Sequence, residues 1–85
     1  MDKNIKLLKA LADNTRFKIV KLLMNGEKCV CEIFPHVKRT QSTTSIQLNV
    51  LRKAGILDSR KEGKKAFYKI KNPLIIKLIK LLEEK

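Results

Sequence analysis

The chain has 85 residues, the length of one small domain. A hydrophobic content of 44% excludes a disordered chain, and with only 5% aromatic residues the core must be packed mostly by Leu, Ile and Val. The formal net charge of +12, from 20 Lys and Arg against 8 Asp and Glu, indicates a polyanionic partner, with nucleic acid favoured over a membrane surface.

No stretch has the pattern of a secretory signal or approaches the roughly 20 apolar residues of a membrane span. We therefore expect a cytoplasmic protein with no membrane partner, in a compartment that keeps thiols reduced. No Ser-His-Asp, paired-carboxylate or phosphate-loop pattern occurs, and the single histidine, His36, has no evident catalytic partner. We expect no enzyme.

Three short helices are predicted in the first half of the chain. Apolar residues at helical spacing predict the first over residues 3–12. Asp13 is a good N-cap for the second, which stops near Gly26. Residues 30–37 predict a third helix that is short or bent at Pro35, because a proline inside a helix removes a hydrogen bond.

A fourth helix is predicted between Thr40, its N-cap, and Gly55, which ends it. Its inward positions are Thr44, Leu48 and Leu51. The other face carries short uncharged donors and acceptors in place of the Glu and Lys of an ordinary solvated face: Gln41, Ser42, Thr43, Ser45, Gln47 and Asn49. Such a face suits hydrogen bonds to base edges in a DNA major groove, and a merely polar surface helix is the alternative.

A β-hairpin is predicted next, with strands over residues 57–61 and 64–71 around a turn at Glu62 and Gly63. Gly63 can supply the positive φ that a tight hairpin turn requires. Four basic residues lie near the tip: Arg60, Lys61, Lys64 and Lys65. A basic hairpin beside a candidate recognition helix is what a winged helix-turn-helix uses to contact phosphates.

The last predicted helix covers residues 73–84, with Asn72 as N-cap and Pro73 at its first position. It is too apolar for a helix with one side in water. Together with the first helix it predicts a homodimer contact, and an intrachain cap over the core is the alternative. The residues expected at the dimer interface are Ile5, Leu8, Leu74, Ile75, Leu78, Leu81 and Leu82.

Four stretches, "LKALADNTRFKIVKLL", "CVCEI", "TQSTTSIQLNVLRKAGIL" and "RKEGKKAFYKI", resemble the ArsR/SmtB family of winged-helix repressors. The resemblance implies one winged helix-turn-helix domain over residues 1–85, mainly α with a small β-hairpin, in the order helix–helix–helix–helix–strand–strand–helix. It also implies a homodimer that reads bases with the fourth helix, and release from DNA when a metal or oxidant binds. Gln47 stands where the family often has His, and the last helix lacks the Asp and His residues of the family's zinc site there.

Cys29 and Cys31 match the family's thiolate sensor motif, and the candidate ligand is a thiophilic ion: arsenite, cadmium, lead or zinc. Some members have a third cysteine where this chain has Phe34. Residues two apart on a helix point about 200° apart, so both sulfurs can bind one ion only if Cys29 lies outside the helix. A soft ion prefers more sulfurs than these two. A redox pair, or two small packed hydrophobes, are the alternatives.

The leading interpretation is a dimeric transcriptional repressor on a palindromic operator in double-stranded DNA. A ligand-independent repressor and a sequence-tolerant chromatin protein with the same charge are the alternatives. A protein-interaction module using the last helix is a further one.

Overall fold

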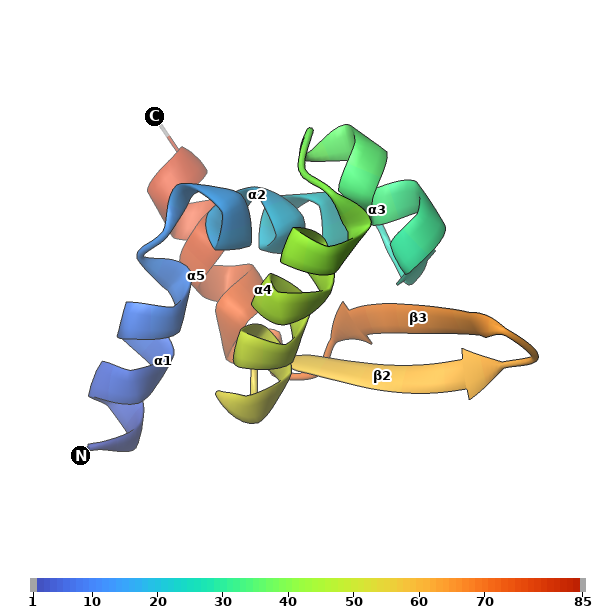
Figure 1. Cartoon of the computed structure of the whole chain (residues 1–85). Helices are drawn as coiled ribbons and strands as arrows, with labels where there is room; N and C mark the ends of the chain where they lie inside the picture. The colour runs from blue at the N-terminus through green and yellow to red at the C-terminus, as the bar shows by residue number, and fades with distance from the viewer. Residues whose placement is uncertain (1, 85) are drawn as a thin grey trace.

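The computed structural model describes residues 2–84. Its elements are α1 (Lys3–Leu11), α2 (Asn14–Leu23), β1 (Lys28–Cys29), α3 (Val30–His36), α4 (Gln41–Lys53), β2 (Leu57–Glu62), β3 (Lys65–Ile70) and α5 (Pro73–Glu83). Figure 1 shows α4 between α1 and the hairpin β2–β3, which projects from the helices as a wing. The predicted fold class, mainly α with a small hairpin in a winged helix-turn-helix order, is confirmed. The short strand β1 is an addition to it.

Side-chain caps begin the helices where the sequence predicts them. The Asp13 carboxylate accepts a hydrogen bond from the backbone N–H three residues on at 3.0 Å. The Thr40 hydroxyl accepts from the N–H three residues on at 3.1 Å. The Asn72 side-chain oxygen accepts from the N–H two residues on at 3.0 Å. Each cap accepts a hydrogen bond from a first-turn N–H group that has no acceptor within the helix. These three residues therefore determine where α2, α4 and α5 start.

One core holds the helices against the base of the wing. Every helix contributes to it, and the end of α4 and the first residue of β2 close it. Its largest fully buried side chains are Ile19, Val20, Ile33, Thr44, Leu48, Leu51, Ile56, Leu57, Ile75 and Ile79. The three predicted inward positions of α4 are among them, so the orientation of this helix about its own axis is confirmed.

The turn between α3 and α4 is tight because α3 ends in a Schellman motif. Pro35 lies in the last turn of α3, which ends one residue later. Lys38 then adopts a left-handed φ of 57°. Its N–H donates to the Pro35 carbonyl at 3.2 Å, and the Arg39 N–H donates to the Phe34 carbonyl at 3.3 Å. The chain thus reverses within a few residues and enters α4 at Thr40.

The sheet has three strands in the order β1-β3-β2. The hairpin turn falls at Gly63 and Lys64, one residue later than expected, and Gly63 has the predicted positive φ, at 62°. Strand β1 pairs with β3 so that Cys29 lies opposite Phe67. Two residues are too few for a periodic signal, and the sequence did not predict this strand. Its consequence is that the first cysteine is tied to the wing.

Helix α5 has a buried side and an exposed side. Ile75 is fully buried inside its own chain, so its predicted place at the dimer interface is wrong. Leu74, Leu81 and Leu82 are 59%, 67% and 61% exposed. The helix caps the core with one face, as the alternative interpretation had it, and leaves the other face for a partner. Among residues 2–84, no helix is long and apolar enough to cross a membrane.

The buried side of α5 gives a stability prediction. Replacing Ile75 by Ala is expected to lower the free energy of unfolding by about 2–5 kcal/mol, because it leaves a cavity in the core. Lys80→Ala, on the exposed side of the same helix, is the control and should change it by less than about 0.5 kcal/mol. Urea unfolding at one protein concentration measures both. An Ile75→Ala loss as small as the control would contradict the burial of Ile75.

Candidate nucleic-acid interface

The predicted base-reading residues of α4 all lie outside its buried stripe, which is formed by Thr44, Leu48 and Leu51. Gln41, Ser42 and Ser45 are exposed, whereas Thr43, Gln47 and Asn49 are half-buried. Thr43 also belongs to the cap, since its hydroxyl accepts a hydrogen bond from Thr40 at 3.0 Å. The structure therefore gathers the exposed members, Gln41, Ser42 and Ser45, on one side of the first half of the helix, whereas Thr43 and Gln47 lie on its other flank.

Two amide side chains of α4 are held by arginines. Arg16 of α2 donates through Nη1 to Oε1 of Gln47 at 2.7 Å, and its Nε donates to the Ala10 carbonyl at 2.6 Å. Arg52 donates through Nη2 to Oδ1 of Asn49 at 2.7 Å. The oxygen of each amide thus accepts one hydrogen bond from an arginine, which turns the NH2 group outward as a donor for a base or a phosphate. Nothing in the sequence pairs Arg16 with a residue 31 positions away.

The wing presents lysines at its tip. Lys61, at the end of β2, and Lys64 and Lys65, in the turn and at the start of β3, are all exposed. The hairpin carries them away from the helical body (Figure 1). Ammonium groups in such a position are suited to contact phosphates beside a groove occupied by α4.

Arg60 differs from these lysines because two carboxylates neutralise it. Its Nε and Nη2 donate to the two oxygens of Glu27 at 3.0 and 2.7 Å, and its Nη1 donates to Glu62 at 2.9 Å. The guanidinium carbon also lies 4.6 Å from the centroid of the Phe67 ring. The sequence placed Arg60 among the free cations of the wing, but the structure uses it to clamp β2 to the segment before β1.

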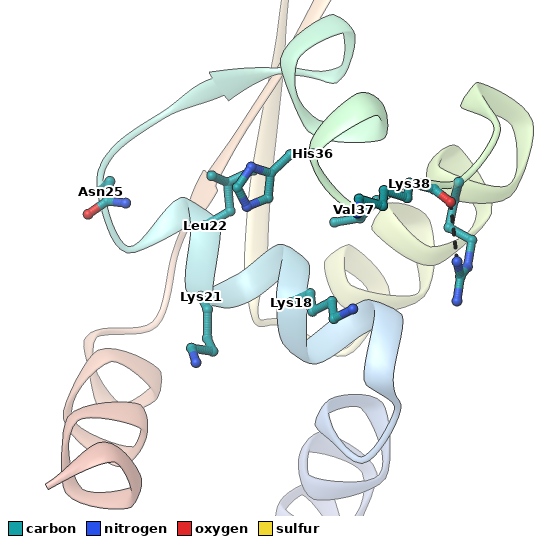
Figure 2. A pocket seen from close by; sticks show the side chains of 8 residues that line it. Lys18, Lys21, Leu22, Asn25, His36, Val37 and Lys38 are labelled. Carbon is teal, nitrogen blue, oxygen red and sulfur yellow. Dashed lines mark hydrogen bonds between the residues drawn. The ribbon is translucent and has the colours of Figure 1, made fainter.

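A second basic surface lies beside the entrance to α4, and the sequence prediction missed it. An open hollow of about 450 Å³ is lined by Lys18, Lys21, Leu22, Asn25, His36, Val37, Lys38 and Arg39. Figure 2 shows these side chains spreading apart instead of converging, with Lys21 pointing away from His36. Lys21 pairs with Glu83. The hollow is therefore a basic surface whose side chains do not point toward one bound ligand. In the sequence, the two consecutive basic residues Lys38 and Arg39 just before the N-cap of α4 indicated it.

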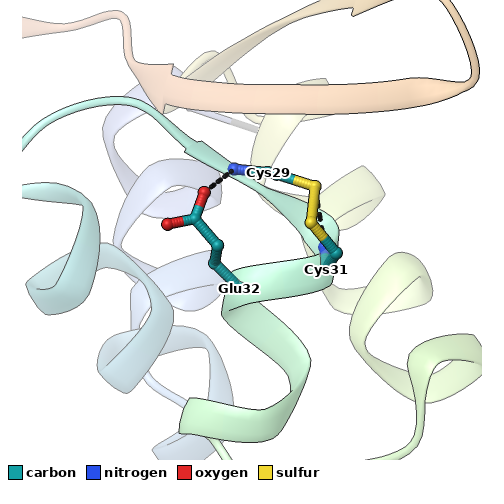
Figure 3. Close-up of a disulfide and its surroundings, with 3 residues drawn as sticks. All are labelled: Cys29, Cys31 and Glu32. Carbon is teal, nitrogen blue, oxygen red and sulfur yellow. Dashed lines mark hydrogen bonds between the residues drawn. A yellow bond between two sulfur atoms is a disulfide. The ribbon is translucent and has the colours of Figure 1, made fainter.

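The two cysteines meet at the start of α3. Cys29 is the N-cap, with extended backbone outside the helix, and it is 4% exposed, whereas Cys31 is exposed. Their sulfurs are joined in a disulfide, where reduced thiols were expected (Figure 3). The Cys31 N–H donates to Sγ of Cys29 at 3.0 Å, and the Cys29 N–H donates to Oε1 of Glu32 at 3.1 Å. The condition predicted for shared ligation, Cys29 outside the helix, is met.

The donor set at this point is incomplete for a soft metal ion. Once reduced, the cysteines offer two sulfurs at one place, which fits half of such a site. Glu32 is already engaged with the backbone of Cys29. Within residues 2–84 no group of three or more His, Cys, Asp and Glu side chains could hold a metal.

The Arg60 clamp gives a pH prediction. Hydrogen bonds from Arg60 lower the pKa of Glu27 below its ordinary value of 4.5. The pair therefore stabilises the folded chain above pH 4.5, and the contribution is lost as the pH falls through the lowered pKa. Arg60→Gln should raise the pKa of Glu27 in an NMR carboxyl titration, and Lys61→Gln, on the same strand, should leave it low. A wild-type pKa of Glu27 at or above the ordinary value would contradict the clamp.

Comparison with known proteins assigns this arrangement to a family. The sequence profile of the arsR family of bacterial regulatory proteins matches residues 13–59. The HTH-type transcriptional regulator MJ1325 of Methanocaldococcus jannaschii is 45% identical over 84 residues, which are 98% of this chain and 94% of the relative. The cadmium resistance transcriptional regulatory protein CadC of Listeria innocua is 45% identical over 74 residues, which are 86% of this chain but only 62% of CadC.

Among solved structures, the homodimeric winged helix-turn-helix DNA-binding domain Mb0332 of Mycobacterium bovis matches with a TM-score of 0.88 and 30% identity. The match covers 96% of this chain and 76% of that one. The chain belongs to the arsR family of bacterial regulatory proteins and is a DNA-binding transcriptional regulator with a winged helix-turn-helix fold.

Proposed function

We propose that the protein acts as a cytoplasmic homodimeric repressor that reads a palindromic operator with one α4 helix per half-site. The observation that carries the proposal is the exposed face of α4, where Gln41, Ser42 and Ser45 present uncharged donors and acceptors to solvent. The helix is anchored on its other side by three fully buried residues, so this face is held rigidly toward a partner. Base edges in the major groove offer the complementary hydrogen-bonding groups.

Phosphate contacts around this face come from two directions in the proposal. Lys61, Lys64 and Lys65 lie at the wing tip on one side, and Lys38 and Arg39 lie before the N-terminus of α4 on the other. Arg60 has the structural role described above. Each protomer has a formal net charge of +12, so binding should weaken steeply with salt.

The proposed dimer interface is the outer surface of α1 and α5. An apolar hollow of about 420 Å³ lies between these helices, lined by Asn4, Leu7, Leu8, Leu74, Lys77, Leu78 and Leu81. The exposed fractions are 46% for Ile5, 50% for Leu8 and 59% for Leu74. An exposed apolar surface of this kind is typical of a protein–protein interface. A two-fold axis through this surface would place the two α4 helices at a fixed separation, as a palindrome requires.

Two substitutions test this division of roles on DNA. Ser42→Ala should relax base preference, at a cost of about 1–3 kcal/mol at one base pair, because it removes a base contact. Lys65→Ala should weaken all sequences alike and reduce the salt slope by about 1 per protomer, because it removes a phosphate contact. Fluorescence anisotropy on a panel of singly substituted operator duplexes, at several salt concentrations, measures both.

Lys80→Ala is the control for charge alone, since Lys80 lies on α5, outside α4 and the wing, and does not line the apolar hollow between α1 and α5. It should change neither the base preference nor the salt slope. The same sequence-independent loss in Ser42→Ala and Lys65→Ala would show that α4 does not read bases.

We also propose that reduced Cys29 and Cys31 bind a thiophilic ion and that binding releases DNA. Three observations support this: the two sulfurs meet at one point, Cys29 belongs to a strand paired with the wing, and the relative CadC is a cadmium resistance regulator. The bound ion would connect the start of α3 to whichever group provides the third ligand of the ion. Zinc and lead are further candidates for the same two thiolates, and redox sensing or simple packing of the cysteines are the alternatives.

The test starts from protein reduced by a dithiol, which supplies two electrons and two protons to the disulfide. Cadmium or arsenite should then produce thiolate–metal absorption in the ultraviolet and lower operator affinity by roughly 5- to 150-fold. Cys29→Ser and Cys31→Ser should each abolish both effects. Wild-type operator binding that ignores both ions would leave the cysteines without a sensing role.

A further inference from the structure

Ile46 is an exposed apolar side chain in the middle of the polar face of α4. It is 61% exposed. The other large apolar side chains that are more than 40% exposed all lie on α1 and α5, at the proposed dimer surface: Ile5, Leu8, Leu74, Leu81 and Leu82. Ile46 therefore belongs neither to the core nor to that surface, within the part of the chain that the structure describes.

The neighbours of Ile46 on the helix surface are polar toward the N-terminus of α4. Residues three and four positions apart are adjacent on a helix, so Ser42 and Thr43 precede Ile46, and Asn49 and Val50 follow it. Helical side chains lean toward the N-terminus, so Ile46 covers the turn of Ser42 and Thr43. The N-terminal half of a recognition helix is the part that contacts base edges.

On DNA, an apolar side chain at the centre of such a face is matched by an apolar group on a base. The side chain of isoleucine is a hydrocarbon, so it forms no hydrogen bond with water or with a base. The major-groove edges of the four bases carry one methyl group, the 5-methyl of thymine. We propose that Ile46 contacts the 5-methyl group of a thymine in each half-site and so determines specificity there. This inference rests on the proposed function, with α4 in the major groove.

Replacing thymine by uracil tests the contact because it removes the methyl group and keeps the base pairing. The wild-type protein first selects its preferred duplex from random DNA. Each thymine of that duplex is then replaced by uracil, one position at a time, and affinity is measured by anisotropy. Losing the burial of one methyl group should weaken binding about fourfold at one position, and about 15-fold when both half-sites carry the change.

Two variants make the test specific. Ile46→Ala should bind the thymine and uracil duplexes equally at that position. Val50→Ala is the matched control: Val50 is an exposed apolar residue of the same helix, 37% exposed, but it borders the hollow beside α1. It should keep the full uracil penalty of the wild type. Both residues are exposed, so neither substitution should unfold the chain.

The outcomes separate this inference from the proposed function. Specific binding with no uracil penalty at any position, or a penalty that survives in Ile46→Ala, would overturn the thymine contact alone. Equal affinity for selected and scrambled duplexes would overturn the proposed function and the thymine contact together. A uracil penalty at one thymine per half-site, lost in Ile46→Ala and kept in Val50→Ala, is the result expected.

Discussion

Three buried side chains decide what helix α4 shows to solvent. Thr44, Leu48 and Leu51 are each fully buried between α4 and the rest of the core. Turning the helix about its axis would expose Leu48 and Leu51 to water, at a cost in folding free energy of about 2 kcal/mol for each. The rotation of the helix, and with it the face turned to solvent, is therefore fixed. The exposure of the donors at Gln41, Ser42 and Ser45 and of Ile46 follows from this anchor.

Polar contacts link the wing and the recognition helix to separate parts of the chain. Arg60 clamps the wing to Glu27, and β1 pairs Cys29 with Phe67 of the wing. Arg16 instead joins the end of α1 to Gln47 of α4. The first cysteine is thus connected to the wing through β1, and the end of α1 is connected to α4 through Arg16.

Local signals in the sequence predicted the elements and their limits. Asp13, Thr40 and Asn72 cap helices because a side-chain oxygen beside a free N–H needs no distant partner, and Gly63 turns the hairpin for a similarly local reason. Contacts across the chain could not be predicted in this way. Glu27 and Arg60 are 33 positions apart, and periodicity alone does not say whether an apolar residue such as Ile75 faces its own core or a second protomer.

In the proposed function, the exposed face of α4 makes this basic protein sequence-specific. The most direct measurement is a competition titration of the reduced protein between a labelled fragment of its own promoter and a scrambled duplex of equal length and composition, at physiological salt. We expect the promoter fragment to be bound at least about 1,000-fold more tightly. Equal affinity for the two duplexes would contradict it and would indicate a chromatin protein that binds through charge alone.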